Sequence, residues 1–174
     1  MFSQENESNK ERVIPDLVVQ TAASPGESYK ICADFIEKMR TRYPKRNYLL
    51  KGIIDNLDPD KHPRTPISYF GKVKEEIVGI IVGEKEGDVF NGYIFLVDQK
   101  YQNTNVAVSL MRSLQADEST IKLVPAPIGM RKYTSPEQRE HLTRALERYY
   151  KRFGFVPSSN HTMVWHRGNP KKNV

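Results

Sequence analysis

The chain has a single cysteine, Cys32, among its 174 residues, and it has one tryptophan. One thiol excludes an intrachain disulfide and a cysteine-based zinc site. No apolar run approaches the roughly 18 consecutive residues that a membrane-spanning helix needs. The polar N-terminus, Met1 to Lys10, also lacks the apolar core of a secretory signal. These absences predict a cytoplasmic protein that has no membrane partner.

Acidic residues are fewer than basic residues. The sequence has 27 Lys and Arg against 21 Asp and Glu, which gives a formal net charge of +6. A basic surface favours polyanionic partners such as nucleic acid, anionic lipid or a phosphorylated cofactor. A basic surface that is merely solvated gives the same count, so the charge by itself identifies no site.

The length fits one domain with a sizeable core. Residues 1–12 carry almost no large apolar side chain and are expected to form a disordered tail. Residues 169–174 are expected to form a short basic tail. The sequence therefore predicts a single domain over residues 13–168.

The first part of this domain predicts a strand followed by two helices. Val13–Ala22 is rich in β-forming residues. Ser24 and Pro25 then have the form of a helix N-cap and first helical position, and Pro44 ends the helix that they open. The apolar spacing over Tyr48–Leu57 predicts a second, short helix.

The hydrophobic periodicity of the sequence changes twice in the central and C-terminal parts of the domain. Three strands are expected over Ile67–Val73, Ile77–Glu84 and Val89–Val97, and their short polar connections indicate an antiparallel meander. The remaining elements are expected to be a helix over Asn105–Leu114, a strand over Ile121–Val124, a helix from the Ser135 cap to about Phe153, and a strand over Met163–Trp165. The predicted class is α/β, with a mixed, mainly antiparallel central sheet flanked by helices.

The segment Tyr93–Leu114 has the pattern of a strand, a polar loop and a helix. The loop, Gln102–Asn105, opens directly onto the helix. Because the first N–H groups of a helix have no intrahelical partner and carry positive potential, such a loop can bind an anion such as a pyrophosphate. Most corners of this kind are only connections, so the feature needs further support.

This segment resembles the signature of the GCN5-related N-acetyltransferases (GNAT), in which a strand leads to Gln/Arg-x-x-Gly-x-Gly/Ala and a helix. Gln102 and Ala107 match the outer positions, whereas Asn105 stands where the family usually has glycine. The resemblance implies acetyl-CoA as cosubstrate, with the backbones of Phe95 and Val97 pairing with its pantetheine arm. The residues implied to bind its pyrophosphate are those of the loop and first helical turn: Gln102, Asn103, Thr104, Asn105, Val106 and Ala107.

A second match lies near the C-terminus. The family's Tyr-x-x-x-Gly-Phe ending corresponds here to Tyr150–Phe155. The resemblance implies that Tyr150 protonates the departing thiolate as a general acid, which a phenol with a pKa near 10 can do. The helical phase assigns the neighbouring Tyr149 to the core and leaves Tyr150 beside it, available to a site.

The position that corresponds to the family's usual general base carries a different residue here. Family members often carry a glutamate eleven residues before the motif glutamine, and that position is Asn91 here. An amide cannot accept a proton at neutral pH. Asp88 and Glu84 lie nearby in the sequence and are the candidates for proton transfer through water.

The leading hypothesis is therefore an N-acetyltransferase that moves an acetyl group from acetyl-CoA to a primary amine of a small molecule or a protein. The acceptor pocket is expected between the first two helices and the loop His62–Pro66. No metal is expected, because His161 and His166 fall on opposite faces of a strand. The alternatives are an inactive binding module of the same fold and a protein directed at nucleic acid or tRNA; a homodimer is left open.

Overall fold

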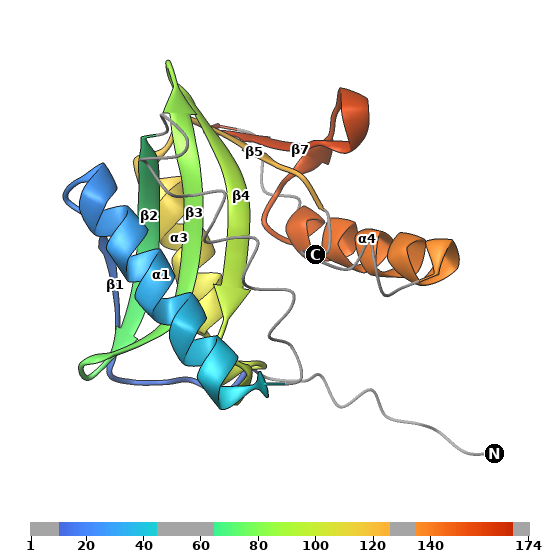
Figure 1. Ribbon diagram of the computed structural model, residues 1–174. Helices are drawn as coiled ribbons and strands as arrows, with labels where there is room; N and C mark the ends of the chain where they lie inside the picture. The colour runs from blue at the N-terminus through green and yellow to red at the C-terminus, as the bar shows by residue number, and fades with distance from the viewer. Residues whose placement is uncertain (1–10, 45–64, 126–134, 169–174) are drawn as a thin grey trace.

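The structure, a computed structural model, describes residues 11–44, 65–125 and 135–168 (Figure 1). Several predicted segments lie outside the described residues: the helix over Tyr48–Leu57, residues 1–10 of the N-terminal tail predicted over 1–12, the tail over 169–174, and most of the loop His62–Pro66. No helix in the described part of the chain is long and apolar enough to span a membrane.

A seven-stranded sheet of order β1-β2-β3-β4-β5-β7-β6 forms the centre of the molecule. Its strands are β1 (Leu17–Thr21), β2 (Pro66–Val73), β3 (Glu76–Glu86), β4 (Val89–Val97), β5 (Thr120–Leu123), β6 (Val156–Pro157) and β7 (Met163–His166). The helices are α1 (Pro25–Arg42), α3 (Val106–Asp117) and α4 (Pro136–Lys151), and a 3₁₀ turn, η2, covers Gln99–Tyr101.

All neighbouring strands pair antiparallel except β4 and β5, which pair parallel. The predicted mixed, mainly antiparallel sheet and its central meander are thereby confirmed. The first strand is shorter than the predicted Val13–Ala22, because the chain enters β1 only at Leu17, beyond Pro15. The short strand β6 was not predicted.

Helix α1 covers one face of the sheet (Figure 1). It begins as its sequence predicts: the Ser24 hydroxyl accepts the Glu27 N–H at 3.2 Å, and the Glu27 carboxylate accepts the Ala23 N–H at 2.6 Å. Its apolar side packs on β2, β3 and β4. Cys32 is 1% exposed in this packing and belongs to the core.

Helix α3 covers the opposite face and lies close to the sheet at Gly79 of β3. A Cβ atom at Gly79 would stand 3.0 Å from a Val106 methyl carbon and 2.9 Å from a Leu110 methyl carbon. Both distances are shorter than ordinary Cβ contacts, so a larger residue would force these side chains to shift, and glycine lets the first turns of α3 sit this deep. Because Gly79 pairs with Val97, this contact fixes the N-terminus of α3 beside the end of β4.

Helix α4 lies beside β5 and β7, away from α1 (Figure 1). It opens with a complete capping box: the Ser135 hydroxyl accepts the Gln138 N–H at 3.2 Å, and the Gln138 side chain accepts the Ser135 N–H at 3.0 Å. Gly154 follows the helix with φ +84° and turns the chain, so that Phe155 packs against Tyr150.

Candidate functional site

Strands β4 and β5 separate midway along β4. They pair from Val89 opposite Thr120 to Gly92 opposite Leu123. Strand β5 ends at Leu123, whereas β4 continues to Val97, and the two ribbons diverge beyond this point (Figure 1). The separation divides the sheet into a part covered by α1 and α3 and a part that carries α4.

A β-bulge marks the place where the separation begins. Val82 of β3 pairs with Ile94 and Gly83 pairs with Gly92, so Tyr93 is an extra residue of β4. The bulge shifts the alternation of side chains. Tyr93 packs towards α1, whereas Phe95 packs towards α3 and α4 on the opposite face.

The loop between β4 and α3 leads directly into the first turn of the helix. Asn103 has φ +58°, a left-handed conformation that asparagine tolerates. The Thr104 hydroxyl donates to the Tyr101 carbonyl at 2.6 Å and accepts the Val106 N–H at 3.4 Å. The loop thereby folds tightly against the first turn of α3, and Asn105 occupies the N-cap.

Residues just before β1 lie along this loop, which corrects the prediction that Glu11 and Arg12 belong to a disordered tail. The Arg12 N–H donates to the Asn103 carbonyl at 3.0 Å, and the Asn105 N–H donates to the Arg12 carbonyl at 3.1 Å. The Asn105 side-chain oxygen also accepts the Ile14 N–H at 2.7 Å. A composition poor in apolar residues does not indicate these contacts, because backbone groups make all of them except one.

The two tyrosines near the end of α4 are buried in the reverse of the predicted order. Tyr150 is 5% exposed and belongs to the core, whereas Tyr149 is half-buried and packs against Phe95 of β4. The helical phase could not foresee this, because Phe155, which returns after the Gly154 turn, covers the Tyr150 ring. Burial raises the pKa of Tyr150 to about 12, so the phenol keeps its proton at neutral pH.

The Tyr149 hydroxyl is buried and has no hydrogen-bond partner among the described residues. Burial, and to a smaller extent the charge of Glu11, raise the pKa of this phenol. Buried hydroxyl groups are normally paired. A ligand bound beside Phe95, next to the diverging strands, could supply such a partner.

The candidate bases lie at different distances from the bulge. Glu84 pairs with Asn91 across β3 and β4, and the alternation of β3 places both on the α1 face of the sheet. Asp88 lies exposed in the turn between β3 and β4, and its carbonyl accepts the Ser119 hydroxyl at 3.0 Å. The structure therefore brings Glu84 near the bulge and leaves Asp88 at the far end of the strand.

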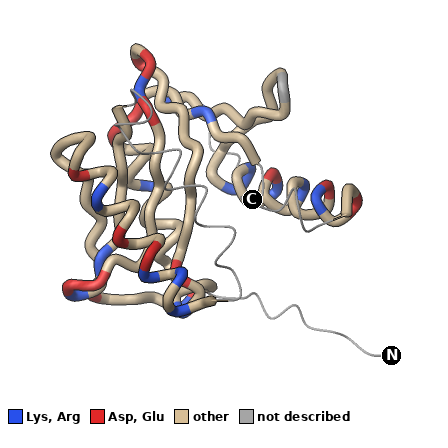
Figure 2. The backbone as a smooth tube through the Cα atoms, viewed as in Figure 1, with Lys and Arg blue, Asp and Glu red and all other residues tan. Residues whose placement is uncertain are grey.

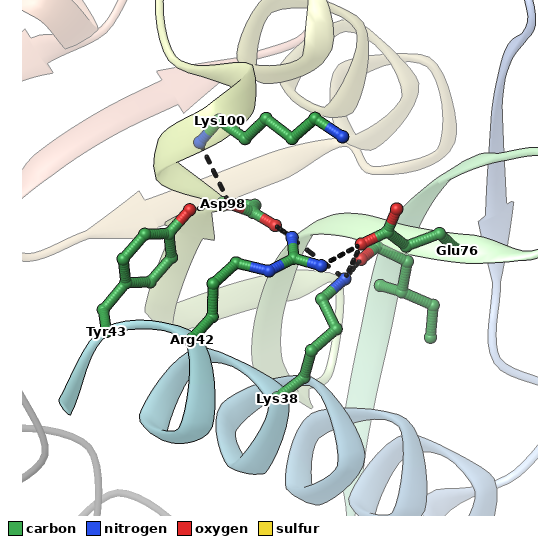
Figure 3. Close-up of polar contacts among 7 residues, drawn as sticks. Lys38, Arg42, Tyr43, Glu76, Asp98 and Lys100 are labelled. Atoms are coloured by element: carbon green, nitrogen blue, oxygen red, sulfur yellow. Dashed lines mark hydrogen bonds and ion pairs between the residues drawn. The ribbon is translucent and has the colours of Figure 1, made fainter.

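A buried carboxylate anchors the corner where the loop begins, and no pattern in the sequence indicates it (Figure 3). Asp98, immediately after β4, is 0% exposed. It accepts a hydrogen bond from the Arg42 guanidinium, the Tyr43 hydroxyl at 2.6 Å and the Lys100 N–H at 3.0 Å. The last turn of α1 is thus fastened to the corner that leads into the loop.

Glu76 completes this cluster from the start of β3. Its carboxylate lies 2.9 Å from both the Lys38 ammonium and the Arg42 guanidinium (Figure 3). Hydrogen bonds from Lys38 and then from Arg42 lower the pKa of Glu76. In the sequence, Asp98 is only a single acidic residue after a predicted strand, and this pattern indicates no site. The cluster forms because the fold brings α1 and β3 to that residue.

No protein-family model and no curated protein matches the sequence. Solved structures do match the fold. An acetyltransferase from Thermus thermophilus has a TM-score of 0.54 at 12% identity, over 87% of this chain and 99% of that one. An aminoglycoside 6'-N-acetyltransferase complexed with coenzyme A has a TM-score of 0.53 at 12% identity, over 86% and 96%.

An acetyltransferase of the GNAT family from Staphylococcus aureus has a TM-score of 0.52 at 12% identity, over 86% of this chain and 99% of that one. The chain therefore has the GNAT fold, and the resemblance that the two sequence motifs indicated is confirmed at the level of the fold. At this identity the likeness establishes the fold and not the reaction.

Proposed function

We propose that the protein is an acetyl-CoA-dependent N-acetyltransferase acting on a primary amine. The observation that carries this proposal is the divergence of β4 and β5 beside the N-terminus of α3. Acetyl-CoA would supply the thioester whose acetyl group is transferred. The fold is shared with an aminoglycoside acetyltransferase solved with coenzyme A, which supports this choice of cosubstrate.

The residues along the separation fit such a ligand. The loop from Gln102 to Ala107 ends in the first turn of α3, where N–H groups favour phosphate. The backbones of Phe95 and Val97 lie on the part of β4 that extends beyond β5, so they can pair with an extended amide-bearing chain. The orphan hydroxyl of Tyr149 beside Phe95 offers that chain one more polar partner.

The catalytic groups would act from opposite faces of the sheet. The amine approaches from the α1 face, where Glu84 can take its proton through water. Backbone N–H groups near Val97 can donate to the carbonyl oxygen as it gains negative charge. Tyr150, on the α4 side, donates its phenolic proton to the departing thiolate.

Two measurements test this proposal in sequence. Calorimetry should detect acetyl-CoA binding to the full chain, and free thiol should then appear when a panel of amines is added. Tyr150→Phe should lower turnover by about 100-fold, the usual contribution of a general acid, while acetyl-CoA affinity stays unchanged. Tyr149→Phe is the comparison variant: it should weaken acetyl-CoA binding, because it removes the hydroxyl that would pair with the ligand, and it should leave turnover at saturating acetyl-CoA unchanged. An absence of acetyl-CoA binding at millimolar concentration would refute the assignment.

A binding module of the same fold that performs no chemistry is the second candidate. Two observations favour it: Asn91 stands at the usual position of the base, and burial raises the pKa of Tyr150 to about 12. A catalytic acid works best when its pKa lies near the working pH. This candidate predicts acetyl-CoA binding with no thiol release from any amine.

A nucleic-acid partner is a third candidate, which rests on the net charge of +6. Along α4, basic residues are interspersed with acidic ones in the chain (Figure 2), so this helix carries both signs of charge. Affinity for RNA or DNA that falls steeply with salt, and that falls when residues 167–174 are deleted, would support this candidate. Absence of binding at low salt would remove it.

A further inference from the structure

The residues that precede β1 meet the proposed phosphate end of the site at four points. Three are the hydrogen bonds that join Arg12 and Ile14 to Asn103 and Asn105. The fourth joins the Glu11 carboxylate to the Arg152 guanidinium, at 3.7 Å, where α4 ends. We call residues 11–14 the strap. It crosses from the loop before α3 to the end of α4.

The strap presents acceptor groups to donors that suit a phosphate. The Arg12 carbonyl takes the N–H of Asn105, one of the loop groups that would bind a pyrophosphate. The Glu11 carboxylate lies 3.7 Å from the Arg152 guanidinium, a group that can also pair with phosphate. The partial negative charge of the Arg12 carbonyl and the full negative charge of the Glu11 carboxylate thus lie where a phosphorylated ligand would place its own oxygens.

The Asn105 side chain fastens the strap. Its oxygen accepts the Ile14 N–H at 2.7 Å across a large separation in sequence. Glycine has no side chain and cannot make this contact. The departure from the usual glycine therefore has a structural consequence, since it supplies the third hydrogen bond of the strap.

We propose that the strap is an intramolecular competitor that covers the phosphate end of the acetyl-CoA site and must leave before the cosubstrate binds. This inference rests on the proposed function and concerns the regulation of the same site. Because one N–H cannot donate fully to two acceptors, the Arg12 carbonyl and a phosphate oxygen exclude each other at Asn105. The apparent affinity for acetyl-CoA is then reduced by the fraction of molecules whose strap is open.

The substitution Arg12→Pro tests the strap. Arg12→Pro removes the N–H that donates to Asn103, whereas the matched control Arg12→Ala keeps this N–H and removes only the exposed side chain. One intramolecular hydrogen bond shifts a local equilibrium by about fivefold. Calorimetry should therefore show acetyl-CoA binding about five- to tenfold tighter for Arg12→Pro than for Arg12→Ala. Deletion of residues 1–12 should have the same effect, and melting curves verify that all variants are folded.

Trypsin provides a second measurement on the unaltered chain. The bond after Arg12 is protected while the strap lies on the loop, so acetyl-CoA should accelerate cleavage between Arg12 and Val13, followed by mass spectrometry. Slower or unchanged cleavage would overturn the proposal, as would Arg12→Pro binding no tighter than Arg12→Ala when the wild type binds. If the wild type and every variant fail to bind acetyl-CoA, the proposed function falls, and the role of the strap falls with it.

Discussion

Asp98→Asn probes the anchor of the loop while it preserves the shape of the side chain. The carboxylate is fully buried and accepts hydrogen bonds from Arg42, Tyr43 and Lys100. An amide keeps one acceptor oxygen and turns the other position into a donor, so at least one of the two side-chain donors is left facing an N–H group.

The expected cost follows from the exposure of the partners. A hydrogen bond to a charged group contributes about 1.5–3 kcal/mol. The Arg42 side chain is 36% exposed, so water replaces part of its lost partner. We therefore expect Asp98→Asn to lower the free energy of unfolding by about 2–4 kcal/mol, less than the sum of three separate bonds.

Urea unfolding followed by circular dichroism measures this loss. Tyr43→Phe is the matched control, because it removes only one neutral donor and should cost about 1 kcal/mol. A loss for Asp98→Asn of less than about 1 kcal/mol would show that the cluster is solvated in solution and does not anchor the loop.

Three further predictions concern stability. Gly83→Ala should cost about 2 kcal/mol or more in urea unfolding, because its Cβ would stand 2.5 Å from the Asn91 carbonyl oxygen at the bulge, whereas Gly26→Ala, with nothing within 4 Å, should cost nothing. Since the pKa of Glu76 is lowered on folding, the stability that it contributes is present above its unfolded pKa and lost as the pH falls through the folded value; Glu76→Gln should lack this loss in acid melting curves. Since the pKa of Tyr150 is raised to about 12, its contribution is complete below about pH 10 and lost as the pH rises through 12, and Tyr150→Phe should flatten this alkaline decline.

Local patterns were sufficient for most of the elements. The cap hydrogen bond forms at both predicted N-caps, Ser24 and Ser135, and the reciprocal bond of a capping box forms at Ser135, because these contacts join residues only three apart. The three central strands lie within a few residues of their predicted ends for the same reason: alternation and tight turns are properties of adjacent residues.

The features that shape the site depend on contacts between distant segments, and the sequence did not show them. The Tyr93 bulge arises from the register of β3 against β4. The burial of Tyr150 depends on Phe155 after the Gly154 turn. The strap joins Arg12 to Asn105 mainly through backbone groups, and these contacts do not depend on residue type, so the sequence does not indicate them. The sequence pattern therefore locates the loop, but it does not identify the strap residues that lie against the loop.

The separation of β4 from β5 determines whether the candidate acid and base can serve one reaction. A continuous sheet would keep Glu84, on the α1 face, apart from Tyr150, which packs on the opposite face. In the proposed reaction, a thioester lying where the strands part would be reachable from both faces. Asp88 is five residues before the bulge at Tyr93, or about 16 Å along an extended strand, so only a long chain of waters could connect it. For the proposed reaction, the geometry therefore favours Glu84 over Asp88 as the group that would receive the proton of the amine.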